Sequence, residues 1–185
     1  MTALLLIGIV ASSIAGVPQS APDARFKDFS DRVATYVKLR KSAESGLPRL
    51  KKKTQDARKL DDRQEALVKK VRELRKGAKQ GDVFTPAVSE AFAQMIKMEF
   101  AGPDGIQAEK TIRAGDALKG FKVYVNQIYP EALPFTTVPP TLLLKLPPLP
   151  ADVGYRILGS DLLLVDSKSR LIIDYIPNAL PALNS

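Results

Sequence analysis

The chain has 185 residues, 45% of them hydrophobic, which suffices for one core or for a helical module joined to a small sheet. It contains no histidine and no cysteine. Nucleophiles activated by histidine, thiol redox chemistry and zinc sites with nitrogen or sulfur ligands are therefore excluded. Any catalysis would have to use carboxylates, lysines, tyrosines or hydroxyl groups.

The N-terminal segment has the pattern of a secretory signal peptide. The apolar run ALLLIGI is followed by small residues, with Ser13 and Ala15 at positions −3 and −1 of a cleavage site before Gly16. We expect residues 1–15 to be removed and the protein to be exported, to the periplasm or outside the cell. No other segment is long and apolar enough to span a membrane. Because the segment lacks lysine and arginine, its retention as an anchor is the alternative.

Two apolar stripes at helical spacing predict two amphipathic helices, which we expect to pack as an antiparallel hairpin. Asp56 is the expected N-cap of the second helix. The first stripe is Phe26, Phe29, Val33, Tyr36, Arg40, Ala43 and Leu47, and the second is Ala57, Leu60, Gln64, Leu67, Val71, Leu74 and Ala78. Arg40 interrupts the first stripe.

A third helix is predicted to start at Thr85 and Pro86, a capping hydroxyl followed by proline at the first helical position, and to stop at the segment AGPDG. The preceding segment, GDVFTP, has one glycine before the helix, which favours helix entry over a phosphate-binding loop. A shorter helix is predicted over residues 104–113.

From Phe121 onward the pattern changes to strands and prolines. FKVYV alternates as a strand, PPTLLLKL is expected to form one or two helical turns, and residues 155–176 read as an antiparallel meander. We therefore predict an α+β fold: a basic helical region over residues 16–120, then a Pro-rich connector and a small antiparallel sheet over residues 121–185.

Two turns set the register predicted for the meander, Gly159-Ser160 and the four residues SKSR. Leu158 then faces Asp161, and Leu164 faces Ile173. One face of the sheet becomes apolar, with Tyr155, Ile157, Leu162, Leu164, Leu171, Ile173 and Tyr175. The other is mixed, with Arg156, Leu158, Asp161, Leu163, Val165, Ile172, Asp174 and Ile176.

Asp161 and Asp174 allow two interpretations on this mixed face. The favoured one makes them surface residues, with Asp174 paired to Arg156. The alternative is a carboxylate pair for acid/base chemistry or for a divalent cation, which needs a concave, desolvated setting.

Positive charge is concentrated between Arg32 and Lys79, with 17 basic and six acidic residues and a net charge of +11. The segment RLKKK within it could bind anions such as lipid headgroups, or could be a solvated loop. Its basic side chains, the candidate anion-binding residues, are Arg49, Lys51, Lys52 and Lys53. No aromatic residue lies between Val37 and Val83, so a stacking platform for single-stranded nucleic acid is absent there.

The segments GDVFTP, VNQIYPEALPFTTVPPTLLLKLPPLP and YRILGSDLLLVDSKSRLIIDYIPNAL together resemble a set of uncharacterised secreted bacterial proteins with the same order of segments. The resemblance covers residues 45–185 and implies export and a helical half followed by a small sheet. The terminal hairpin is also similar to that of periplasmic nickel/cobalt-homeostasis proteins of the RcnB type, although the absence of histidine here argues against a metal role.

These observations predict an exported, non-catalytic protein that interacts with an unknown protein or with an anionic surface of the envelope. No cofactor is expected, and nucleic acid is not the expected partner. The alternative is a carboxylate-dependent hydrolase or metal-binding protein that uses Asp161 and Asp174.

Overall fold

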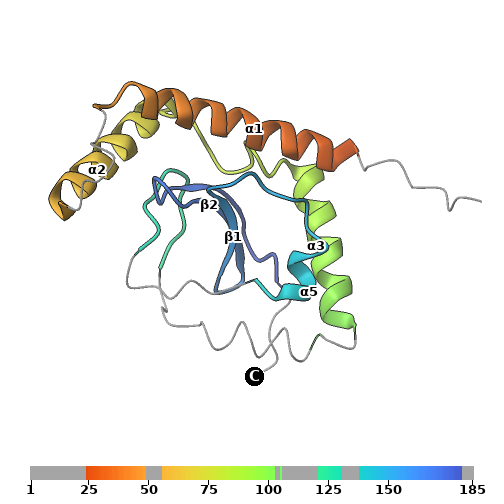
Figure 1. The fold of residues 1–185 in the computed structure, drawn as a ribbon. Coiled ribbons are helices and arrows are strands. Elements are labelled where there is room, and N and C mark those ends of the chain that lie inside the picture. The colour runs from red at the N-terminus through yellow and green to blue at the C-terminus, as the bar shows by residue number, and fades with distance from the viewer. Residues whose placement is uncertain (1–23, 49–55, 103–104, 106–120, 131–137, 181–185) are drawn as a thin grey trace, which may run out of the picture.

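The computed structural model describes residues 24–48, 56–102, 105, 121–130 and 138–180. Within these residues, helices precede a small open sheet of three antiparallel strands in the order β1-β2-β3, so the α+β prediction is confirmed (Figure 1). The helices are α1 (Ala24–Ser45), α2 (Ala57–Leu74), α3 (Pro86–Ala101) and the single turn α5 (Pro140–Leu143). The strands are β1 (Val153–Leu158), β2 (Asp161–Asp166) and β3 (Ile172–Ile176).

The helices form where the apolar stripes and the capping residues predict them. Thr85 caps α3 by accepting the backbone N–H of Val88, and Pro86 occupies the first turn. Asp56 is at the N-cap position of α2, but its side chain makes no capping hydrogen bond. The helix predicted over residues 104–113 lies outside the described residues, apart from Gly105.

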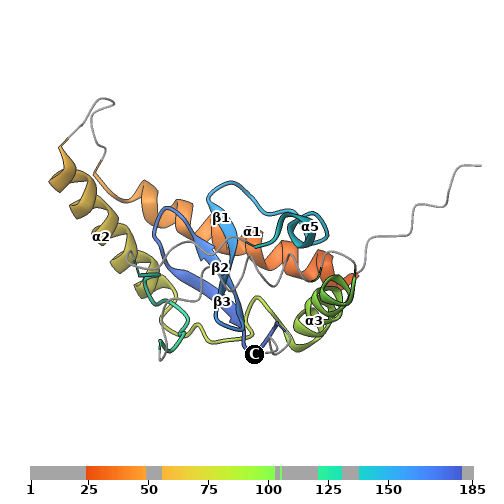
Figure 2. The same ribbon diagram turned by 90° about the horizontal axis from the view of Figure 1, so that it is seen from below.

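α1 lies along one side of the sheet, whereas α2 diverges from α1 to form the second arm of a V (Figure 2). Their contact is at the C-terminal part of α1, where the side chain of Lys70 lies against Gly46. The main core fills the space between α1, the inner side of α2, α3, α5 and the sheet. Its centre is a group of stacked and edge-on rings, in which Phe29 contacts Phe84, Phe92 and Tyr155 at centroid separations of 5.2 to 6.3 Å.

The Pro-rich segment contributes to this core through Val138, Leu142 and Leu146, which are 5% exposed or less. α5 forms at the predicted prolines, and its end is tied to α3 by the ion pair between Lys145 and Glu99. These apolar side chains explain why a stretch so rich in proline is ordered.

The predicted pairing of β1 with β2 is confirmed. The predicted pairing of β2 with β3 is correct next to the turn, where Val165 pairs with Ile172, and wrong farther from it. Leu158 pairs with Asp161 as expected, but Leu164 pairs with Asp174 instead of Ile173, because a β-bulge at Ile173 shifts the pairing between Val165 and Leu164. The extra residue in β3 reverses which side chains face which side from Asp174 onward. Asp174 therefore points toward the main core side, and Tyr175 toward the opposite face.

That opposite face, on which Asp161 and Asp174 are expected as surface residues, is largely covered. Residues 121–130 lie over it, and Val123 and Tyr129 pack with Leu163, Val165 and Ile172 in a second apolar cluster. FKVYV is not a strand. The segment turns at Asn126, where φ is +63°, and makes only an isolated bridge between Ile128 and Leu171.

Candidate functional site

Asp174 is a fully buried carboxylate that organises the entrance to α3. One of its oxygens accepts the backbone N–H groups of Val83 at 2.7 Å and Phe84 at 2.8 Å, and the other accepts those of Gly81 at 3.0 Å and Tyr175 at 2.8 Å. Four charge-assisted hydrogen bonds saturate the carboxylate. The GDVFTP segment thus does gather backbone N–H groups around an anion, but the anion is a side chain of its own chain.

The predicted ion pair between Asp174 and Arg156 is therefore wrong, because the bulge places the two side chains on opposite faces of the sheet. Arg156 instead donates to the carbonyl of Tyr155 at 2.7 Å. Asp161 lies beside the Gly159-Ser160 turn, as predicted, and is partly exposed. It accepts the backbone N–H of Asn178 at 2.9 Å. Asp161 and Asp174 therefore bind different segments of backbone.

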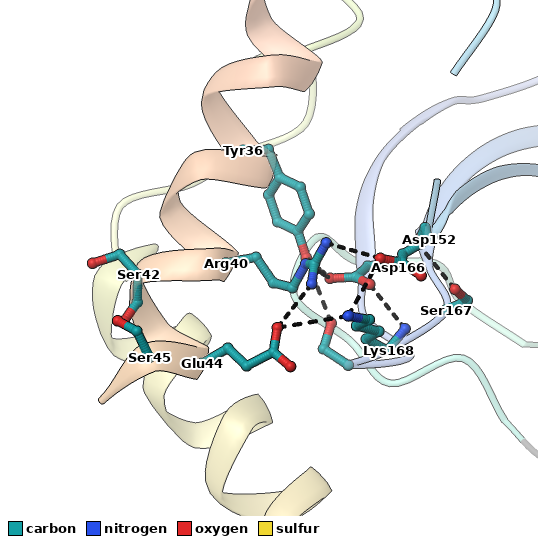
Figure 3. A network of polar contacts seen from close by, with 10 residues as sticks. Tyr36, Arg40, Ser42, Glu44, Ser45, Asp152, Asp166, Ser167 and Lys168 are labelled. Atoms are coloured by element: carbon teal, nitrogen blue, oxygen red, sulfur yellow. Dashed lines mark hydrogen bonds and ion pairs between the residues drawn. The ribbon is translucent and has the colours of Figure 1, made fainter. Parts of the chain in front are cut away.

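A second buried polar network joins α1 to the open end of the β1–β2 hairpin, where the start of β1 and the end of β2 lie side by side (Figure 3). Arg40, which is 1% exposed, lies among three carboxylates: Glu44 at 3.1 Å, Asp152 at 3.3 Å and Asp166 at 3.5 Å. Lys168 approaches Asp152 at 3.5 Å and Glu44 at 3.8 Å from the solvent side. Two cations and three carboxylates nearly balance, which is the condition for burying charge at this depth.

Tyr36 extends this network from α1 toward α2. Its hydroxyl donates to Asp166 at 2.6 Å, and the guanidinium of Arg75 lies 5.0 Å from the centre of its ring. Burial, with the charge of Asp166 as a second cause, raises the pKa of Tyr36. Burial also lowers the pKa of Arg75 from its ordinary value.

Arg75 also donates hydrogen bonds to the irregular backbone at the edge of β3 and to the segment beside it. It donates to Asn126 at 2.7 Å and to the carbonyl of Ile173, the residue at the bulge, at 2.8 Å. Gln80 donates to the carbonyl of Tyr175 at 3.4 Å. The end of α2 and the loop after it therefore cover an edge that could otherwise pair with another strand.

Chemically, these buried groups are structural acceptors and donors. The carboxylates of Asp166 and Asp174 accept hydrogen bonds from donors of the protein itself, and both side chains are 0% exposed. In the described ranges, no three carboxylates, histidines or cysteines are grouped so that they could hold a metal ion. The sequence signal for the network was Arg40 within an apolar stripe, since a charge at a core position needs buried partners. Asp166 and Tyr36 carried no such signal.

An open groove of about 1010 Å³ runs along one flank of α2. Val68 and Ile128 supply its apolar part, and Ile128 is 42% exposed. Charged side chains form most of its walls: Asp61, Glu65, Lys69, Arg72 and Glu73 from α2, Lys76 from the turn after it, and Arg170 from the turn before β3. Arg72 is held in place by the carbonyl of Asn126 at 2.9 Å.

The candidate anion-binding residues Arg49, Lys51, Lys52 and Lys53 lie outside the described residues. In the sequence they lie between α1 and α2, and α2 carries further cations on a second flank. Lys59, Arg63 and Lys70 share this flank because they are four and seven residues apart. Arg63 donates to the carbonyl of Pro48, just before the undescribed segment.

The site and fold define an α+β protein with an open, charged groove and saturated internal carboxylates. Comparisons with protein-family models, with curated proteins and with solved structures find no match. Among the helices of the described part of the chain, none has the length and apolar character required to cross a membrane.

Proposed function

We propose that the protein is an exported, non-catalytic interaction protein whose basic helical half contacts an anionic surface of the envelope. The observation that carries this proposal is the basic flank of α2, where Lys59, Arg63 and Lys70 lie on one side of the helix that follows RLKKK in the sequence. Lys59 is exposed, and Arg63 and Lys70 are half-buried. Each lysine or arginine close to an anionic lipid surface contributes about 1 kcal/mol of attraction. Export rests on the signal-peptide pattern and on the resemblance to secreted bacterial proteins.

A hydrolase or metal-binding role for Asp161 and Asp174 has less support. The carboxylate of Asp174 is occupied by four backbone N–H groups and has no exposed surface. A general base must reach a substrate proton, and this carboxylate could do so only if the loop before α3 were displaced.

Co-sedimentation with vesicles tests the surface-binding proposal. Vesicles containing phosphatidylglycerol should bind the protein at low salt and release it at high salt, because the attraction between exposed charges is screened. Vesicles of phosphatidylcholine alone should not bind it. Binding that is indifferent to salt or lipid charge would contradict the proposal.

A matched pair of charge reversals localises the binding surface. Lys52→Glu with Lys53→Glu should weaken sedimentation strongly. Lys97→Glu with Lys122→Glu makes the same change of charge at exposed positions outside α2 and the connection before it, and should weaken it much less. Export is tested separately by N-terminal sequencing of the exported protein, which should begin at or near Gly16. Soluble protein that retains Met1 would overturn that part.

A further inference from the structure

The groove face of α2 carries charges in an order that is complementary to itself. Asp61 and Glu65 come first along the groove, and Lys69, Arg72 and Lys76 follow, with Val68 near the midpoint. Glu73 is the one acidic groove residue in the second half. The spacing is the same read in either direction from a point between residues 68 and 69, with steps of four, three, one, three and four. The six positions are Asp61, Glu65, Val68, Lys69, Arg72 and Lys76.

The charges of this row are available to a partner. The side chains of Asp61, Glu65, Lys69 and Lys76 are exposed, and none of them forms an ion pair with another residue of the described ranges. Arg72 is exposed as well, although its Nε is bound to the carbonyl of Asn126. Residues three and four apart lie on one side of a helix, which groups the positions from Asp61 to Arg72 along the groove. Lys76 continues the row from the turn that follows Leu74.

We propose that this groove is occupied by a second copy of the chain, with the two α2 helices antiparallel across a two-fold axis. Asp61 then faces Lys76 of the partner subunit, and Glu65 faces Arg72 of the partner subunit. Each pair occurs twice in the dimer because a two-fold interface is isologous. At the centre, the aliphatic stem of the partner's Lys69 lies over Val68, which is 6% exposed and belongs to the chain's own core, so the contact there is small.

The charge balance of the groove favours this occupant over a polyanion. Three carboxylates and four cations line it, and the carboxylates at the start of α2 would repel an anionic chain laid along it. An antiparallel copy instead places each acidic half against a basic half. The exposed side chain of Ile128, on the opposite wall, adds apolar contact.

The dimer should be weak, reversible and sensitive to salt. α2 has 18 residues, about 27 Å at a rise of 1.5 Å per residue, so the contact is short for a permanent interface. Its exposed ion pairs are screened at high ionic strength. This inference uses the groove flank of α2 and does not depend on the proposed envelope function, which uses the opposite flank.

Sedimentation equilibrium of the intact chain tests the proposal through a charge exchange between residues 61 and 76. Asp61→Lys alone, or Lys76→Asp alone, should weaken dimerisation at least about tenfold, since two attractive pairs become two repulsive ones. The double variant should dimerise about as well as the parent. An equimolar mixture of the two single variants should form a mixed dimer, because its two pairs are again of opposite charge.

Asp62→Lys is the matched control, since it makes the same change of charge one residue outside the row and should leave the dimer intact. Circular dichroism of each variant checks that α2 is still folded. A parent that stays monomeric at low salt and high concentration would overturn the proposal and make a foreign partner the occupant. A dimer that the single variants do not weaken, or that the exchange does not restore, would overturn the antiparallel arrangement.

Discussion

The carboxylate of Asp174 accepts the backbone N–H of Phe84 at 2.8 Å, across 90 residues of sequence. This contact ties β3 to the residues that lead into α3, and it exists because the bulge in β3 turns Asp174 toward the main core side. A side chain on the edge strand thus holds together the helical part and the sheet.

Asp174→Asn should lower the free energy of unfolding by about 2 to 4 kcal/mol. The amide loses the charge that strengthens four hydrogen bonds, and its NH₂ group would face backbone donors in a site without water access. Asp161→Asn is the matched control. Asp161 is partly exposed and has one backbone donor, so its change should stay near 0.5 kcal/mol. Denaturant unfolding measures both, and equal effects of the two substitutions would contradict the structural role of Asp174.

Arg40→Met should destabilise the protein by about 3 to 5 kcal/mol, because it leaves the fully buried carboxylate of Asp166 without its cation. Adding Asp166→Asn to this variant should recover part of the loss, since the unpaired charge is removed. Arg32→Met removes an exposed ion pair with Asp28 and should cost less than about 1 kcal/mol. If the double variant is less stable than Arg40→Met alone, charge burial is not the main cause.

Leu164→Ala should cost about 2 to 5 kcal/mol through lost burial and the cavity left in the core, since Leu164 is 0% exposed. Leu144→Ala removes the same atoms from a side chain that is 87% exposed and should change stability by about 0.5 kcal/mol or less. Thermal or denaturant unfolding distinguishes them. A small effect at Leu164 would show that the sheet does not bury the face that contacts α1.

Tyr36 should make the protein less stable at alkaline pH. Its pKa is raised in the folded protein, so its contribution to stability is fully present below the unfolded value of about 10 and is lost as pH rises above it. Tyr36→Phe lacks this dependence, so the stability difference between parent and variant should shrink above pH 10. Denaturant unfolding from pH 8 to 11 provides the measurement, with Tyr124→Phe as a control at an exposed position. A difference that stays constant with pH would refute the assignment.

The sequence alone was sufficient for α1, α2, α3 and α5, for the hairpin turns and for the fold class. These features depend on local patterns: apolar spacing, Thr85 with Pro86 at the start of α3, and the Gly159-Ser160 turn, where Gly159 has φ of +58°. Within β1 and β2 the pairing follows from the turn by counting residues, and the prediction was correct.

Only the tertiary structure decided which way Asp174 points and what surrounds Arg40. The bulge in β3 is stabilised by Arg75 binding the carbonyl of Ile173, a contact that joins residues 98 positions apart. No periodic pattern contains such a contact, and a single extra residue in a strand reverses the facing of every residue that follows. The groove along α2 likewise arises because α2 diverges from α1 and lies beside the segment that contains Ile128 (Figure 2). Long-range packing sets this arrangement, and the pattern of neither segment predicts it.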